Sequence, residues 1–332
     1  MDAWRKWSFP LSLGLFLLIL GGGCQNPFRR PPLVGIISWN QEIQSIRDNC
    51  QGILEGLREE GYLEGINVRL QMVNAEGDRA RAAEAAEKFQ AQGARLLITV
   101  GTVPTLVALD STQGSRLPVV YSAVGAPNAT GLGWEAKDHP RFTGTSSEVP
   151  MVQQLEMFRL AFPDLKRLGI MFCTATPVAV ATGTEAEAAA RQMGLEVVQA
   201  TVTDERPELV DQALAHLLGR KVQGVFVPDD PVLSSPKNLE GICKRLLASR
   251  VPVMVPYGSS VAFGALLSYH ADFGEVGRQA GRQAARILLG TAPDQVPPEI
   301  PRVKRLTLNL RVAQSLNFSL SRRLLSRAHE LH

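Results

Sequence analysis

The sequence predicts an α/β protein of two lobes, each a parallel β-sheet covered by helices, with a hinge between them. Short apolar stretches, typical of buried strands, alternate with helical stretches through most of the chain. The 332 residues, 45% of them hydrophobic, are enough for two domains. The order of elements also repeats: residues 65–73, 95–102 and 116–124 correspond to residues 194–202, 222–230 and 250–258.

In the first half, helix signals separate the predicted strands. The stretch 42–61 carries apolar residues at helical spacing and ends at Gly61, and Asp78 is a typical N-cap for the Ala-rich stretch after it. Pro104 opens a third helix, where a missing N–H costs nothing. Strands are predicted at residues 33–38, 66–73, 96–100 and 118–121, and helices at residues 42–61, 78–92 and from residue 104. This alternation favours a parallel sheet.

The second half shows the same alternation after a crossover strand and hinge at residues 142–147. Strands are predicted at residues 167–173, 195–202, 222–227, 251–256, 264–269 and 302–308, and helices at residues 151–162, 183–193, 208–218, 239–249, 272–289 and 311–316. For residues 320–331, a further helix and a frayed end both remain open. The carboxyl edges of the two sheets are expected to face each other across a cleft that closes on a ligand.

The N-terminus predicts export. Arg5 and Lys6 precede the apolar run 11–20, which is too short to span a membrane and is typical of a signal peptide. Three glycines then precede Cys24 and resemble the bacterial lipobox, which implies cleavage before Cys24 and attachment of a lipid with fatty acyl chains such as palmitate. The alternative is an ordinary signal peptide with a chance cysteine. Residues 25–32 are Pro-rich and predict a tether.

Composition argues against several other classes. The net charge of +3 is too weak for a nucleic-acid-binding protein, which needs a clustered basic stripe. Cys50, Cys173 and Cys243 have no metal-ligand spacing and predict buried thiols, although one disulfide among them stays open. The histidines form no metal spacing either, and phosphate-loop, hydrolase-elbow and zinc-protease motifs are missing from the sequence. We therefore expect no cofactor, no metal and no catalytic residue.

Polar side chains at predicted strand ends are the candidate ligand contacts. Thr102 and Ser122 present hydroxyls that would bind a ligand carboxylate, and the alternative for both is capping of the next helix or turn. Asp229 follows the corresponding strand of the second lobe, and its carboxylate would accept a hydrogen bond from a ligand ammonium. The alternative is that this carboxylate caps a helix or a turn. Asp230 is expected to point to the opposite side of the extended chain.

Aromatic residues at strand ends are the remaining candidates. Trp39, Tyr257 and Tyr269 would stack on a planar or apolar part of the ligand. Packing in the core or at the rim of the cleft is the alternative for each of them.

Several segments, taken in order, resemble one family. The stretch 264–290 (GALLSYHADFGEVGRQAGRQAARILLG), the strand and helix 305–318 (RLTLNLRVAQSLNF) and the segment 61–78 resemble the ABC transporter substrate-binding proteins associated with tryptophan and tyrosine. The motifs VGTVPTLVAL, VYSAVGAP and FTGTSSEVP are similar to its ligand-edge and crossover segments. The cleft positions depart from the family pattern, since Ala126-Pro127 stands where members commonly carry Asp-Pro.

The resemblance implies a type I periplasmic-binding-protein fold with discontinuous lobes. The expected division is a signal peptide at 1–23, a lipidated tether at 24–32, a first lobe at 33–145 plus 265–291, a second lobe at 146–264 plus 292–319, and a tail at 320–332. It also implies delivery of the solute to a membrane permease powered by a separate ATPase. We expect the protein to be a monomer.

The expected function is therefore that of an exported, lipid-anchored solute-binding protein of an ABC importer. Its solute would be an amino acid or a related small compound, held between the lobes by hinge closure. Two alternatives remain: a lipoprotein that binds a ligand and signals to a membrane partner, and an enzyme that acts in the cleft.

Overall fold

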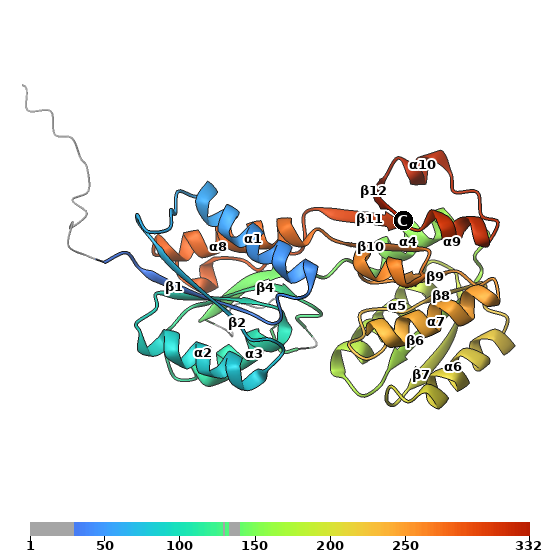
Figure 1. Cartoon of the computed structure of the whole chain (residues 1–332), viewed down its shortest axis with the longest axis horizontal. Helices are drawn as coiled ribbons and strands as arrows, with labels where there is room; N and C mark the ends of the chain where they lie inside the picture. Colours follow the sequence, from blue (N-terminus) through green and yellow to red (C-terminus); the bar gives the residue numbers. More distant parts are fainter. Residues whose placement is uncertain (1–29, 129, 133–139) are drawn as a thin grey trace, which may run out of the picture.

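The computed structural model describes residues 30–128, 130–132 and 140–332, and shows two α/β lobes side by side along the long axis (Figure 1). The first lobe has a parallel sheet in the order β2-β1-β3-β4-β5. Its strands are β1 Leu33–Ser38, β2 Arg69–Asn74, β3 Leu96–Val100, β4 Val119–Val124 and β5 Phe142–Ser146. The signal peptide, Cys24 and most of the tether lie outside the described residues.

The second lobe has a sheet in the order β12-β11-β10-β9-β8-β6-β7. Its strands are β6 Arg167–Cys173, β7 Glu196–Val202, β8 Gly224–Phe226, β9 Val253–Val255, β10 Leu267–Ala271, β11 Lys304–Leu308 and β12 Ala328–Leu331. All paired neighbours in this sheet run parallel except β10 and β11, which run antiparallel. The predicted fold class of two α/β lobes is confirmed.

Helices cover both faces of each sheet, as parallel sheets require. On one face of the first sheet, the apolar residues of two helices form a core with the strands: α1 Gln44–Glu59 and α8 Phe273–Leu288. On the other face, a second core contains the apolar residues of α2 Arg79–Ala91 and α3 Thr102–Ser111. On the second sheet, one core is shared by four helices: α4 Met151–Ala161, α5 Pro177–Gln192, α9 Leu310–Ser315 and α10 Arg322–Leu325. The other core is shared by α6 Pro207–Gly219 and α7 Pro236–Ala248. The described residues also form 3-10 turns at Gly258–Phe263 and Pro293–Gln295.

Local sequence signals account for several element boundaries. The Asp78 carboxylate caps α2 by accepting from the backbone N–H of Ala80 at 2.7 Å, as predicted. Asp272 caps α8 in the same way, through the N–H of Glu275 at 3.1 Å. Cys50, Cys173 and Cys243 are buried free thiols. In the described part of the chain, no helix combines the length and apolar character needed to cross a membrane.

The chain passes between the lobes three times: after β5, after β10 and before β11. The sequence-based boundaries are wrong at the second and third crossings. The sequence-based division places β10 in the first lobe, but this strand pairs with β9 and β11 of the second sheet. The same division places residues 292–299 in the second lobe. They lie on the first, where Val296 is in the core and Thr143 Oγ1 donates to its carbonyl at 2.6 Å.

The C-terminal tail belongs to the second lobe. It forms α10 and then β12, which pairs with β11. The side chain of Leu324 is fully buried in the core that α4 and α5 share. The tail is therefore a helix followed by an edge strand, rather than a helix alone or a frayed end.

The helix α8 returns from the second sheet and docks on α1 through glycines. A Cβ added to Gly277 would lie 2.0 Å from the Asn49 carbonyl oxygen, and one added to Gly52 would lie 1.9 Å from the Gly274 carbonyl oxygen. At the rim of this contact, Arg278 pairs with Glu55 of α1. The backbones of the two helices therefore touch, and this contact fixes α8 to the first lobe.

Candidate ligand-binding site

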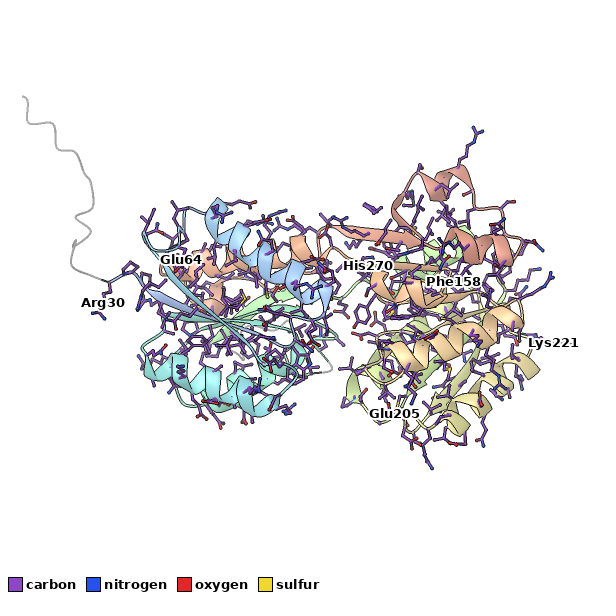
Figure 2. All side chains as sticks on the ribbon, in the orientation of Figure 1. Arg30, Glu64, Phe158, Glu205, Lys221 and His270 are labelled. Carbon is purple, nitrogen blue, oxygen red and sulfur yellow. The ribbon has the colours of Figure 1, made fainter. Side chains whose placement is uncertain are left out.

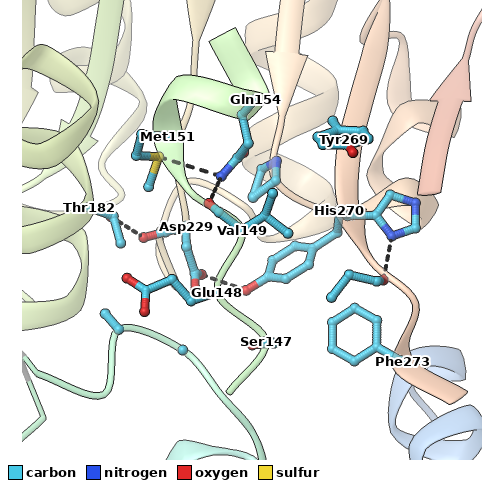
Figure 3. A pocket seen from close by; sticks show the side chains of 15 residues that line it. Ser147, Glu148, Val149, Met151, Gln154, Thr182, Asp229, Tyr269, His270 and Phe273 are labelled. Carbon is cyan, nitrogen blue, oxygen red and sulfur yellow. Dashed lines mark hydrogen bonds between the residues drawn. The ribbon is translucent and has the colours of Figure 1, made fainter. Parts of the chain in front are cut away.

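A cavity lies where the two lobes meet, close to the crossings (Figure 3). Its lining comes from both lobes and from the crossover segments: Gly125, Ala126, Ser147, Glu148, Val149, Met151, Gln154, Thr182, Asp229, Pro256, Tyr257, Tyr269, His270, Ala271 and Phe273. The volume is about 40 Å³, which is room for a few water molecules. The lobes must therefore move apart before a larger solute can enter.

Asp229 and Tyr257 form the polar centre of this cavity. Each follows the carboxyl end of a second-lobe strand, β8 for Asp229 and β9 for Tyr257. The Tyr257 hydroxyl donates to Asp229 Oδ1 at 2.5 Å, and the Thr182 hydroxyl donates to the backbone carbonyl of Asp229 at 2.8 Å. Burial raises the pKa of the Asp229 carboxyl, although the bond from Tyr257 opposes this. Burial also raises the pKa of Tyr257 well above its usual value, so its hydroxyl remains a donor.

Asp229 reaches across to the loop that follows β4 in the first lobe. A Cβ added to Gly125 would lie 2.7 Å from Asp229 Oδ2, so a larger residue at this position would require the carboxylate to shift. The Gly125 N–H donates to Thr102 Oγ1 at 3.2 Å. On either side, Ala123 and Ala126 have positive φ angles of 57° and 41°, which are costly for alanine. This backbone strain lies where the two lobes touch, as is common at ligand sites.

The neighbouring Asp230 has a structural role. Its buried carboxylate accepts from the backbone N–H groups of Cys173 at 2.5 Å, Val232 at 2.8 Å and Leu233 at 2.9 Å. It does not line the cavity, in agreement with the expectation that it points away from Asp229. Asp230 therefore holds the loop that presents Asp229.

The structure brings together half of the residues proposed from the sequence. Asp229, Tyr257 and Tyr269 line the cavity, whereas Thr102, Ser122 and Trp39 do not. Thr102 lies one step behind the lining, through its bond with Gly125. Ser122 is fully buried in β4, and its hydroxyl has no partner among the described residues. Trp39 is half-buried and packs on the first-lobe core beside α2 and α3.

The sequence reasoning missed Glu148 and Gln154. Glu148 lies in the segment that crosses from β5 to α4, and its half-buried carboxylate has no hydrogen-bonding or ion-pair partner within the described chain. Burial raises its pKa, and the charge of Glu185 adds to this effect. Gln154 is 6% exposed; its Nε2 donates to the Val149 carbonyl at 2.8 Å and its Oε1 has no described partner. The crossover motif predicted a hinge but gave no signal for these side chains.

His270 and Phe273 complete the wall toward the crossings. His270 lies between the lobes (Figure 2). Its Nδ1–H donates to the Ala271 carbonyl at 2.9 Å, because a carbonyl can only accept, and Nε2 then accepts from Thr307 at 3.1 Å. Burial lowers the pKa of His270, which favours the neutral ring. Among the residues that the structure describes, the lining therefore comprises two carboxylates and a neutral histidine, with no lysine or arginine.

Replacing Asp229 by asparagine should raise the unfolding temperature of the unliganded protein at pH 8. The raised pKa means that ionised Asp229 lowers the free energy of unfolding above about pH 4, the pKa of an unfolded aspartate. The contribution of protonated Asp229 to the free energy of unfolding has its full value below that pH. This contribution is lost as the pH rises through the pKa of Asp229 in the folded protein. The asparagine variant carries no such charge. Its advantage should shrink as the pH falls from 8 to 4.5, as measured by circular dichroism melting curves.

A variant that is less stable by the same amount at every pH would contradict this reading. The dominant contribution of Asp229 to the unliganded fold would then be the bond from Tyr257, rather than the cost of a buried charge.

Comparison with known proteins finds the family that several segments of the sequence resemble. A family model described as ABC transporter substrate binding protein matches residues 37–332. A curated relative, the tyrosine-binding protein of Clostridioides difficile, is 25% identical over 263 residues, which cover 79% of this chain and 74% of the relative.

Two solved structures have the same fold. One is the ligand-free, open structure of a substrate-binding protein with adhesive properties from Clostridium difficile, with a TM-score of 0.78 and 22% identity, covering 90% of this chain and 98% of that one. The other is a complex with L-Trp from Streptococcus pneumoniae, with a TM-score of 0.74 and 22% identity, covering 91% and 100%. At these identities the likeness shows the fold alone.

Proposed function

This chain belongs to the family of ABC transporter substrate-binding proteins, and on that basis we propose that it captures a small solute at the cavity between its lobes and delivers it to a membrane permease. Substrate-binding proteins of ABC transporters work outside the cytoplasm. The proposal includes closure of the two lobes about the crossings that follow β5 and β10 and precede β11.

The observation that carries this proposal is the meeting of Asp229 and Gly125. These residues come from different lobes, and both line one cavity beside the segments where the chain crosses. A solute held there would contact both lobes at once, so its binding would favour the closed arrangement. The tyrosine-binding relative and the L-Trp complex support an amino acid or a related amine-bearing compound as the solute class.

A thermal-shift screen of the purified protein against amino acids and biogenic amines tests this function. A bound solute should raise the unfolding temperature by an amount that grows with the logarithm of its concentration over its Kd. Calorimetry should then give one site per chain, and the solute should be recovered unchanged by NMR. Chemical turnover of the solute would favour the alternative of an enzyme. A protein that binds none of these compounds and carries no solute after purification would contradict the proposed function.

We further propose that Cys24 carries a lipid anchor. The three glycines before Cys24, at the end of the apolar run, support this. Replacing Cys24 by serine should move the protein from the membrane fraction to the soluble fraction, because the thioether that holds the lipid cannot form. Immunoblotting of the separated fractions measures this. Cys243→Ser, in the core of the second lobe, is the matched control and should leave the protein on the membrane. Equal membrane retention of both variants would contradict the anchor.

A further inference from the structure

We propose that the cavity between the lobes selects organic cations, such as a primary amine or guanidinium on a neutral apolar body, over zwitterionic amino acids. This inference rests on the proposed function and specifies the solute class of the same site. It goes beyond the tyrosine and tryptophan named for the relatives, because both of those solutes carry a carboxylate.

The charges around the cavity are the first argument. Glu148 and Asp229 line it, Glu185 lies near enough to Glu148 to influence its ionisation, and the described residues of the lining include no lysine or arginine. Arg278 and Arg305 line a neighbouring groove, where Arg278 pairs with Glu275 at 2.6 Å and Arg305 with Asp272 at 2.6 Å. A ligand cation would therefore be the counter-charge of the cavity, whereas a ligand carboxylate would meet charges of its own sign.

The hydrogen-bonding groups of the cavity are the second argument. The Tyr257 hydroxyl already donates to Asp229 Oδ1 and the Thr182 hydroxyl to the Asp229 carbonyl, which leaves Ser147 and Tyr269 as the uncommitted hydroxyls of the described lining. The acceptors are more numerous. They include the Glu148 carboxylate, Asp229 Oδ2 and the buried Oε1 of Gln154.

The orientation of the Gln154 amide follows from chemistry. Its Nε2 must face the Val149 carbonyl, because an amide oxygen cannot donate to a carbonyl. The other end of the amide, Oε1, is therefore a hydrogen-bond acceptor. Gln154 is only 6% exposed, and Oε1 has no partner among the described residues. A buried acceptor without a partner lowers stability, so a donor from the ligand would be favourable here. An ammonium group has three donors and no acceptor, so it complements this set.

The apolar part of the lining accounts for the neutral body. The rings of Tyr257 and Phe273 pack with their centroids 6.4 Å apart, and Tyr269, Val149 and Met151 complete the surface. Aromatic faces attract cations as well as apolar groups. A cationic group beside Glu148 and Asp229 would therefore have its carbon skeleton against these side chains.

Calorimetry with two matched pairs of solutes tests the inference on the full-length protein in detergent. Tyramine differs from tyrosine, and agmatine from arginine, by the absence of the carboxylate. At least one amine should bind about tenfold more tightly than its amino acid, or more. If some screened solute binds but neither amine binds better than its amino acid, the inference is overturned and the proposed function stands. If neither pair nor any other screened solute binds, both are overturned.

Glu148→Gln tests the same inference through the protein. This variant keeps the shape of the side chain and removes its charge, so the preference for the amine should fall about fivefold or more. Asp229→Asn should act in the same direction. Glu84→Gln on the exposed face of α2 is the matched control and should keep the full preference. If Glu148→Gln folds and keeps the wild-type preference, the carboxylates do not select the cation and the inference is overturned.

Discussion

Replacing Gly277 by alanine is expected to lower the free energy of unfolding by about 3 kcal/mol or more. The added methyl would lie 2.0 Å from the carbonyl oxygen of Asn49 and 3.0 Å from the backbone nitrogen of Ile53. Both contacts are with the backbone of α1, so neither can be relieved by turning a side chain. The helices must separate, which would expose the core that they share with β1, β3 and β4. Urea unfolding followed by circular dichroism measures the loss.

The same substitution at Gly241 is the control. Gly241 lies in α7, and a Cβ added there meets no atom within 4 Å. Alanine favours a helix over glycine by about 1 kcal/mol, so Gly241→Ala should leave the stability unchanged or raise it slightly. Equal unfolding midpoints for the Gly277 and Gly241 variants would contradict the close contact of α1 and α8.

Replacing Asp229 by alanine should weaken solute binding by about 1.5–3 kcal/mol, roughly 10- to 150-fold in Kd. The reason is that this carboxylate is the acceptor that the second lobe presents at the contact between the lobes, and a ligand ammonium bound to it would lose a charge-assisted hydrogen bond. Calorimetry with the tightest solute of the screen gives the change. Asp211→Ala, in which an exposed carboxylate that pairs with Arg245 on the surface is removed, is the control and should bind normally.

Thr102→Ala should have a smaller effect than Asp229→Ala. The Thr102 hydroxyl contacts Gly125 rather than the cavity, so it acts by positioning the loop after β4. If Asp229→Ala binds the solute as wild type does while remaining folded, Asp229 is not part of the site. If Thr102→Ala is the more damaging of the two, the ligand lies nearer to the first-lobe edge than the cavity indicates.

The sequence predicted the elements well because local signals set them. Asp78 caps a helix, Pro104 lies in the first turn of another, and the apolar runs became buried strands. Asp229 and Tyr257 could also be predicted, because both follow strand ends and the carboxyl ends of parallel strands meet at one edge. These inferences need only the order of neighbouring residues.

The misses concern relations between distant segments. Ser122 is buried because β4 lies between β3 and β5, and sheet order is not visible in a single strand. The strand β10 joins the second sheet through β9 and β11, a pairing that the sequence around residue 265 does not encode. Glu148 enters the cavity because the crossover turns there, and no helix or strand periodicity fixes that turn. Gln154 lies in the first turns of α4, and its place at the cavity depends on where the crossover sets that helix.

The position of the bound solute in a crystal of the complex tests the central claim most directly. The account predicts density between Asp229 of the second lobe and the loop at Gly125 of the first, with the amine of the solute within hydrogen-bonding distance of the Asp229 carboxylate. A solute found instead in the neighbouring groove lined by Gln44, Arg278 and Glu330, with the Asp229 cavity closed and unchanged, would contradict it.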